Sequence, residues 1–151
     1  MQERLLEING TSPERKNARM DELMGLRRGT ELILMVEKDR SVKDLARDMF
    51  RRYGYSVLNA GDAAEAANLY RQHVEKIAVV MIDALSDCAR SRDLFITIRK
   101  INPRVRVIAT SGVSQCPNYR NTLPHGIDGH LRKPYRMTDL LNLVGRLLNG
   151  E

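Results

Sequence analysis

Short apolar runs alternate along the chain with longer segments in which apolar residues recur every three or four positions. Two of the runs, Leu32–Val36 and Ile77–Asp83, contain β-branched residues and lead directly into an acid, Glu37 in the first case and Asp83 itself in the second. Runs of this kind predict strands that are buried on both faces, as in a parallel sheet covered by helices. Three further strands are predicted at Tyr55–Ala60, Val105–Thr110 and Ile127–Leu131.

The segments between the strands have helical spacing. They predict helices at about Ser41–Tyr53, Ala63–Tyr70, Arg92–Ile101 and Thr138–Leu148. Leu45 and Ile101 are expected on the core-facing sides, Gly54 at a helix C-terminal cap and Thr138 at an N-cap. The segment Val113–Pro124 holds two prolines and permits only a short helix.

Alternation of strands and helices predicts an α/β fold, with a parallel sheet and helices on both of its faces. At 151 residues, the chain is expected to form one domain with an appendage. Residues 1–30 are polar and rich in mixed charges, so we interpret them as a linker or docking segment and residues 31–151 as the folded domain.

Composition narrows the class of protein. Apolar residues make up 42% and charged residues 29%, and no apolar run approaches the 18 residues of a membrane span. The N-terminus is charged where a secretory signal is apolar, so a cytoplasmic protein is expected. Cys88 and Cys116 are too few for a disulfide framework. The net charge is +6, yet no basic run exceeds two residues, so a nucleic-acid partner is not expected.

Polar residues with related chemistry follow the predicted strands. Glu37 follows the first strand, Asp83 ends the third, Ser111 follows the fourth and Lys133 comes after the fifth. The ends of the central strands of such a sheet converge on one crevice, so these groups are expected to meet. Clustered carboxylates attract Mg²⁺, and an aspartate beside a cation is a suitable phosphoryl acceptor when a lysine and a hydroxyl hold the transferred oxygens.

Five segments in this order and spacing carry a family resemblance. They are ILMVEKD, YGYSVLNAGDAAEA, VVMID, VIATSG and GHLRKPY. Together they resemble the motifs of the response-regulator receiver domain, the phosphoaspartate switch of two-component signalling, from Leu32 to about Leu148. The resemblance implies a flavodoxin-like, three-layer, doubly wound sheet of five parallel strands in the order 2-1-3-4-5.

The resemblance also implies roles for single residues. Asp83 would be the phosphoacceptor, and Glu37 would order a bound Mg²⁺ and its waters. Leu85 would offer its backbone carbonyl to the metal. Ser111 would hydrogen-bond the phosphoryl oxygen, and Lys133 would pair with Asp83 or the phosphoryl group. The peptide bond after Lys133 would be cis.

The sequence departs from the family pattern most sharply at Lys38, which stands where the second acid is expected. An ammonium about 4 Å from the metal would cost roughly 4 kcal/mol per unit charge pair at an intermediate dielectric, so Mg²⁺ would bind weakly or not at all. Either Lys38 swings outward and Asp39 approaches, or the Lys38 ammonium lies beside Asp83 and replaces the metal's charge. The switch aromatic is His130, and the loop after Asp83 lacks the usual Met-Pro and glycine.

The expected function is therefore signal relay. Asp83 would receive a phosphoryl group from a histidine kinase or phosphotransfer protein, with no enzyme activity beyond autophosphorylation and autodephosphorylation. The switch would act through the fourth helix, fifth strand and fifth helix, a face that would also serve a homodimer. The chain would act as a single-domain protein that binds a partner, or it would be part of a larger kinase. The alternative is a pseudo-receiver, an interaction module without phosphorylation, because of Lys38.

Overall fold

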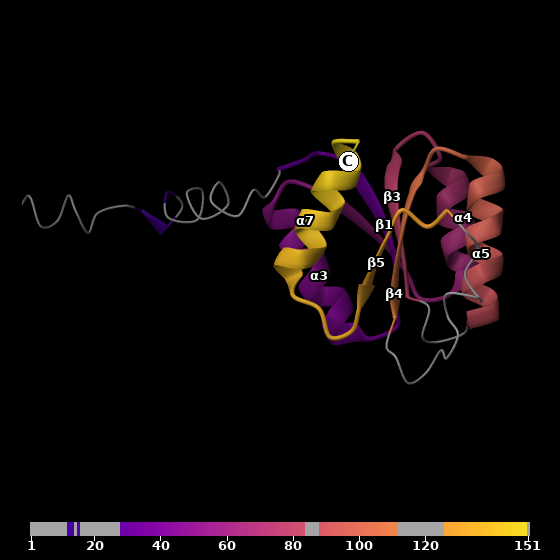
Figure 1. Cartoon of the computed structure of the whole chain (residues 1–151), viewed down its shortest axis with the longest axis horizontal. Coiled ribbons are helices and arrows are strands. Elements are labelled where there is room, and N and C mark those ends of the chain that lie inside the picture. Colours follow the sequence, from indigo (N-terminus) through magenta and orange to yellow (C-terminus); the bar gives the residue numbers. More distant parts are fainter. Residues whose placement is uncertain (1–11, 14, 16–27, 84–87, 112–125, 151) are drawn as a thin grey trace, which may run out of the picture.

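The computed structural model describes residues 12, 13, 15, 28–83, 88–111 and 126–150 of the chain (Figure 1). Strands and helices alternate through these ranges. In chain order they are β1 (Leu32–Val36), α3 (Arg40–Arg52), β2 (Ser56–Ala60), α4 (Ala63–Gln72), β3 (Ile77–Asp83), α5 (Cys88–Ile101), β4 (Arg106–Ser111), β5 (Gly129–Arg132) and α7 (Met137–Leu148). No helix within them is long and apolar enough to cross a membrane.

The five strands form one sheet in the order β2-β1-β3-β4-β5, and every neighbouring pair is parallel. Helices α3 and α7 lie against one face, and α4 and α5 lie against the other (Figure 1). The expected three-layer, doubly wound, flavodoxin-like fold is therefore confirmed. In this topology β1 and β3 are adjacent in the middle of the sheet, so their carboxyl ends open into the same crevice.

The sheet separates two apolar cores, because side chains alternate between its faces. Ile33 and Met35 of β1 face the α3–α7 layer, whereas Leu34 and Val36 face the α4–α5 layer. The central strand β3 is buried over nearly its whole length. Its continuous apolar sequence was the signal from which a parallel, two-sided sheet was predicted.

Local residues set both ends of helix α3. The carboxylate of Asp39 accepts hydrogen bonds from the backbone N–H groups of Ser41 and Val42, and a cap of this kind contributes about 1 kcal/mol. Gly54 has a φ of +94°, a left-handed conformation that favours glycine just after a helix. A Cβ atom there would also collide with the carbonyl oxygen of Gly29, so the predicted C-terminal glycine is confirmed.

Helix α5 begins at Cys88, four residues before the Arg92 predicted from the sequence. The early start was missed because the first turn presents polar residues such as Arg90 to solvent. The inward position in that turn belongs to Ser91, which is buried although it is polar. Strand β5 runs from Gly129 to Arg132, so it starts two residues after and ends one residue after the predicted Ile127–Leu131.

Three predicted side-chain positions were wrong. Leu45 is 53% exposed and Ile101 is 37% exposed, since Leu45 lies on the flank of α3 beside Pro134 and Ile101 is the last residue of α5. Helix α7 starts at Met137, so Thr138 lies inside it. Arg136 precedes the first turn and makes no side-chain capping hydrogen bond.

Candidate functional site

Two carboxylates and one ammonium group meet at the carboxyl ends of the strands. Asp83, the last residue of β3, is 7% exposed, and Glu37, directly after β1, is 3% exposed. The Nζ atom of Lys133, which follows β5, donates to Oε2 of Glu37 at 3.0 Å and to Oδ2 of Asp83 at 3.2 Å. The fold thus brings together three of the residues that the sequence singled out.

The ammonium of Lys133 is held in its charged form. Burial lowers the pKa of Lys133, but the hydrogen bond to Glu37 and the negative charges of Asp83 and Glu37 together outweigh it, so the pKa is raised. For Glu37, burial and the nearby charge of Asp83 raise the pKa of the carboxyl, against the opposing effects of the Asp39 N–H and Lys133. The pocket therefore retains Lys133 as a fixed cation between two acids.

Asp39 is already engaged in the structure of α3. Its carboxylate Oδ1 lies 2.9 Å from the Ser41 nitrogen and 3.2 Å from the Val42 nitrogen, and its own N–H donates to Oε1 of Glu37 at 3.0 Å. This geometry argues against the hypothesis that Asp39 takes the place of the missing acid. Lys38 is exposed but lines the same cavity as Asp83.

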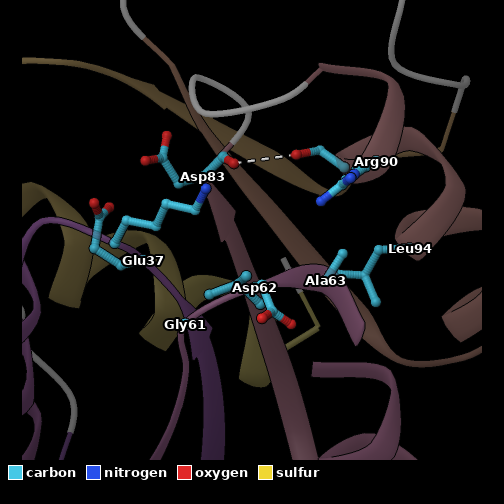
Figure 2. A pocket seen from close by; sticks show the side chains of 10 residues that line it. Glu37, Gly61, Asp62, Ala63, Asp83, Arg90 and Leu94 are labelled. Carbon is cyan, nitrogen blue, oxygen red and sulfur yellow. Dashed lines mark hydrogen bonds between the residues drawn. The ribbon is translucent and has the colours of Figure 1, made fainter. Parts of the chain in front are cut away.

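A cavity of about 80 Å³ opens over Asp83, between the strand ends and the first turns of α4 and α5 (Figure 2). Its lining consists of Val36, Glu37, Lys38, Gly61, Asp62, Ala63, Asp83, Arg90, Ser91 and Leu94. The hydroxyl of Ser91 donates to the backbone carbonyl of Asp83 at 3.1 Å, shown as the dashed line in Figure 2. This contact fixes the end of β3 against α5.

Sequence reasoning did not single out Arg90, and it placed Ser91 in a loop rather than on a buried helix face. A signal for Ser91 was present, because it lies three residues before Leu94 and four before Phe95, in the same helical stripe. Tyr135 was also missed. Its hydroxyl is buried without a hydrogen-bond partner among the described residues, and burial, followed by the charges of Glu37 and Asp83, raises its pKa.

Other predicted site features are only partly described. The peptide bond between Lys133 and Pro134 is cis, as the resemblance implied. The backbone of Ser111 ends β4 in register with Arg132, but its side chain lies outside the described part of the chain. Leu85, the helix expected within Val113–Pro124 and nearly all of residues 1–30 also lie outside it. Their proposed roles remain predictions.

Comparison with known proteins decides the family. A family model for the response regulator receiver domain matches residues 33–145. The chain belongs to this family. A receiver domain is typically a non-catalytic signalling module.

A solved response regulator receiver domain protein from Clostridium thermocellum superposes on this one with a TM-score of 0.72. The two are 23% identical, over 80% of this chain and 95% of that one.

Two curated relatives carry a similar receiver sequence within longer proteins. The DNA-binding transcriptional regulator NtrC of Azospirillum brasilense is 25% identical over 120 residues, which are 79% of this chain and 24% of NtrC. Sensor kinase CckA of Brucella abortus (strain 2308) is 24% identical over 123 residues, 82% of this chain and 13% of CckA. The chain therefore spans a quarter or less of these relatives, and the shared part is the receiver domain of two-component signalling.

Receiver domains typically bind Mg²⁺, but the side chains described here do not fit that ion. Lys38, a cation, lines the cavity, at the position where the family resemblance implies an acid. Of the three carboxylates in the lining, Glu37 and Asp83 both contact Lys133, and Asp62 accepts a hydrogen bond from the Glu65 N–H at the start of α4. Among the described residues, no group of three or more His, Cys, Asp or Glu side chains could hold a metal ion.

Proposed function

We propose that this receiver domain relays a signal by accepting a phosphoryl group on Asp83 from the phosphohistidine of a histidine kinase or phosphotransfer protein. One observation carries the proposal. The Asp83 carboxylate lies at the end of the central strand, lines an open cavity, and has the Lys133 ammonium 3.2 Å away. A nucleophilic oxygen and a cation that can neutralise the incoming phosphoryl oxygens therefore stand side by side.

The chemical step needs few protein groups. An oxygen of Asp83 forms a bond to phosphorus while the P–N bond of phosphohistidine breaks, and the imidazole nitrogen keeps the electron pair and takes up a proton. The product is an acyl phosphate on Asp83. Lys133 then contacts a phosphoryl oxygen in place of the carboxylate oxygen, so the charge balance between β3 and β5 changes. This change is the signal that a partner would detect.

An apolar groove beside the site supports a protein partner. It has a volume of about 460 Å³ and is lined by Ser41, Val42, Leu45, Lys133, Pro134, Tyr135 and Met137. Leu45 is 53% exposed there, and Lys133 belongs both to this groove and to the ion pair with Asp83. A phosphodonor protein seated on the groove would lie close to the acceptor carboxylate.

Phosphoramidate, a small phosphodonor, tests the proposal without a cognate kinase. Incubated protein should gain one phosphoryl group in intact-mass spectrometry, with Mg²⁺ and separately with EDTA in the buffer. Asp83→Asn should not gain it. Asp93→Asn is the matched control, since Asp93 is an exposed acid on α5, and it should react like the wild type. Failure of the wild type under both conditions would contradict phosphorylation of Asp83.

Lys38 favours a second candidate function, a pseudo-receiver that binds a partner without phosphoryl chemistry. A cation that lines the acceptor cavity can hold the pocket in one charge state permanently. In that case neither phosphodonor condition would modify Asp83, and binding of a protein partner would be the same for the wild type and Asp83→Asn. A phosphoryl gain that depends on Asp83 excludes this candidate.

A further inference from the structure

The charges that surround the acceptor cavity balance without a metal ion. The acidic residues of its lining are Glu37, Asp62 and Asp83, and the basic residues are Lys38 and Arg90. Lys133, bound to two of the acids, supplies a third positive charge. An acid in place of Lys38 would leave the cavity with a negative excess that a divalent cation could neutralise. Here that excess has been removed by the protein's own side chains.

Lys38 is placed to act on a ligand in the cavity rather than to support the fold. Both of its neighbours in sequence already have structural contacts, since Glu37 binds Lys133 and Asp39 caps α3. The Lys38 side chain is exposed and its residue lines the same cavity as Asp83. An exposed lysine that lines the same cavity as a buried carboxylate suits a phosphoryl group, whose oxygens carry the negative charge that Lys38 and Lys133 can share.

We propose that Asp83 is phosphorylated without a divalent metal ion, because the ammonium groups of Lys38 and Lys133 neutralise the phosphoryl oxygens. The inference rests on the proposed function of Asp83 as phosphoacceptor. With phosphoramidate, whose nitrogen is protonated at neutral pH, an Asp83 oxygen bonds to phosphorus, the P–N bond breaks, and the nitrogen leaves as neutral ammonia with the electron pair of that bond. The step needs no further reactant.

The decisive measurement is the rate of phosphoryl gain from phosphoramidate in EDTA and in millimolar Mg²⁺, followed by intact-mass spectrometry. The wild-type rates in the two buffers should agree within about twofold. A gain that occurs only with Mg²⁺ would overturn the metal-free step and leave Asp83 as the acceptor. No gain in either buffer would overturn the proposed function itself, so the two failures are distinguishable.

Two substitutions at Lys38 sharpen the test, and both change an exposed side chain. Lys38→Met should slow the reaction in EDTA about tenfold or more, because the second ammonium is lost. Lys38→Asp restores the acid of the family pattern, so it should be slow in EDTA and recover with Mg²⁺. Equal rates for the wild type, Lys38→Met and Lys38→Asp in EDTA would refute the role of Lys38. Thermal unfolding establishes that each variant is folded.

Metal binding can be measured without phosphorylation. Mn²⁺ serves as the probe, because free aqueous Mn²⁺ gives an electron paramagnetic resonance signal that falls when the ion binds. Wild-type protein at a tenth of a millimolar should leave that signal unchanged, whereas Lys38→Asp should reduce it, and Lys38→Asp combined with Asp83→Asn should leave it unchanged again. Loss of the signal with wild-type protein, but not with Asp83→Asn, would contradict the inference.

Discussion

The ammonium of Lys133 lies 3.2 Å from the carboxylate of Asp83, although fifty residues separate them in the sequence. Asp83 ends β3, Lys133 follows β5, and β4 lies between these strands in the sheet. The contact therefore spans the crevice at the carboxyl ends of three strands. It links the position of the β5–α7 connection to the charge on the proposed acceptor.

Replacing Lys133 by Met should destabilise the domain by about 3 kcal/mol, because it leaves the buried carboxylates of Glu37 and Asp83 without their shared cation. Urea unfolding at neutral pH measures the loss. Adding Glu37→Gln should recover part of it, since one buried charge is then removed. Lys76→Met, at an exposed lysine, should change stability by less than about 0.5 kcal/mol. A similar loss in both single variants would contradict the importance of the ion pairs.

Tyr135→Phe should change how stability depends on alkaline pH. Burial, then the charges of Glu37 and Asp83, raise the pKa of Tyr135 above the ordinary tyrosine value of 10.0. Above that pH the unfolded chain loses the proton while the folded chain keeps it, so the wild type loses stability as pH rises. The phenylalanine variant lacks this loss. Urea unfolding should show that the stability of the variant relative to the wild type is greater at pH 11 than at pH 9. Parallel pH profiles of the two proteins would contradict the prediction.

Thr110→Val should stabilise the domain by about 1 kcal/mol. Thr110 is fully buried on β4, and its hydroxyl has no partner among the described residues, so an apolar group of the same shape removes a desolvated hydroxyl. Ser91→Ala is the matched opposite. It removes the hydrogen bond to the Asp83 carbonyl and should cost about 1 kcal/mol. Thermal unfolding should therefore move in opposite directions for the two variants.

Asp128→Ala should destabilise the other end of the sheet by about 2 kcal/mol. Its carboxylate accepts from Arg99 at 2.7 Å and from the Val107 N–H at 2.8 Å, and these bonds tie β5 to α5 and β4. Arg106 lies 3.4 Å from the same carboxylate but is 43% exposed. Arg106→Gln should accordingly cost less than about 1 kcal/mol in urea unfolding. Equal losses would mean that the buried contacts contribute no more than the exposed one.

Strand β3 was predictable because its apolar run is continuous, and the structure reproduces Ile77–Asp83 residue for residue. Helix α3 was predicted within about a residue at each end from the helical spacing of its apolar residues and from Gly54 at its C-terminal cap, whereas the N-cap role of Asp39 was not predicted. The start of α5 was missed because its inward residue in the first turn is Ser91, a polar side chain whose burial depends on the Asp83 carbonyl opposite it. A buried polar residue of this kind cannot be detected from the spacing of apolar residues.

The sequence by itself determined the alternation of strands and helices, the family resemblance and the presence of a cation at Lys38. These follow from local patterns, which act over a few residues along the chain. The sequence also led us to expect that Glu37, Asp83 and Lys133 meet, but only the tertiary structure decided which atoms are in contact and at what distances. In the folded chain, Asp39 caps the start of α3, and Lys133 forms ion pairs with both Glu37 and Asp83. Lys38 lines the acceptor cavity. Packing of the sheet and helices fixes such distances between residues that are remote in the chain.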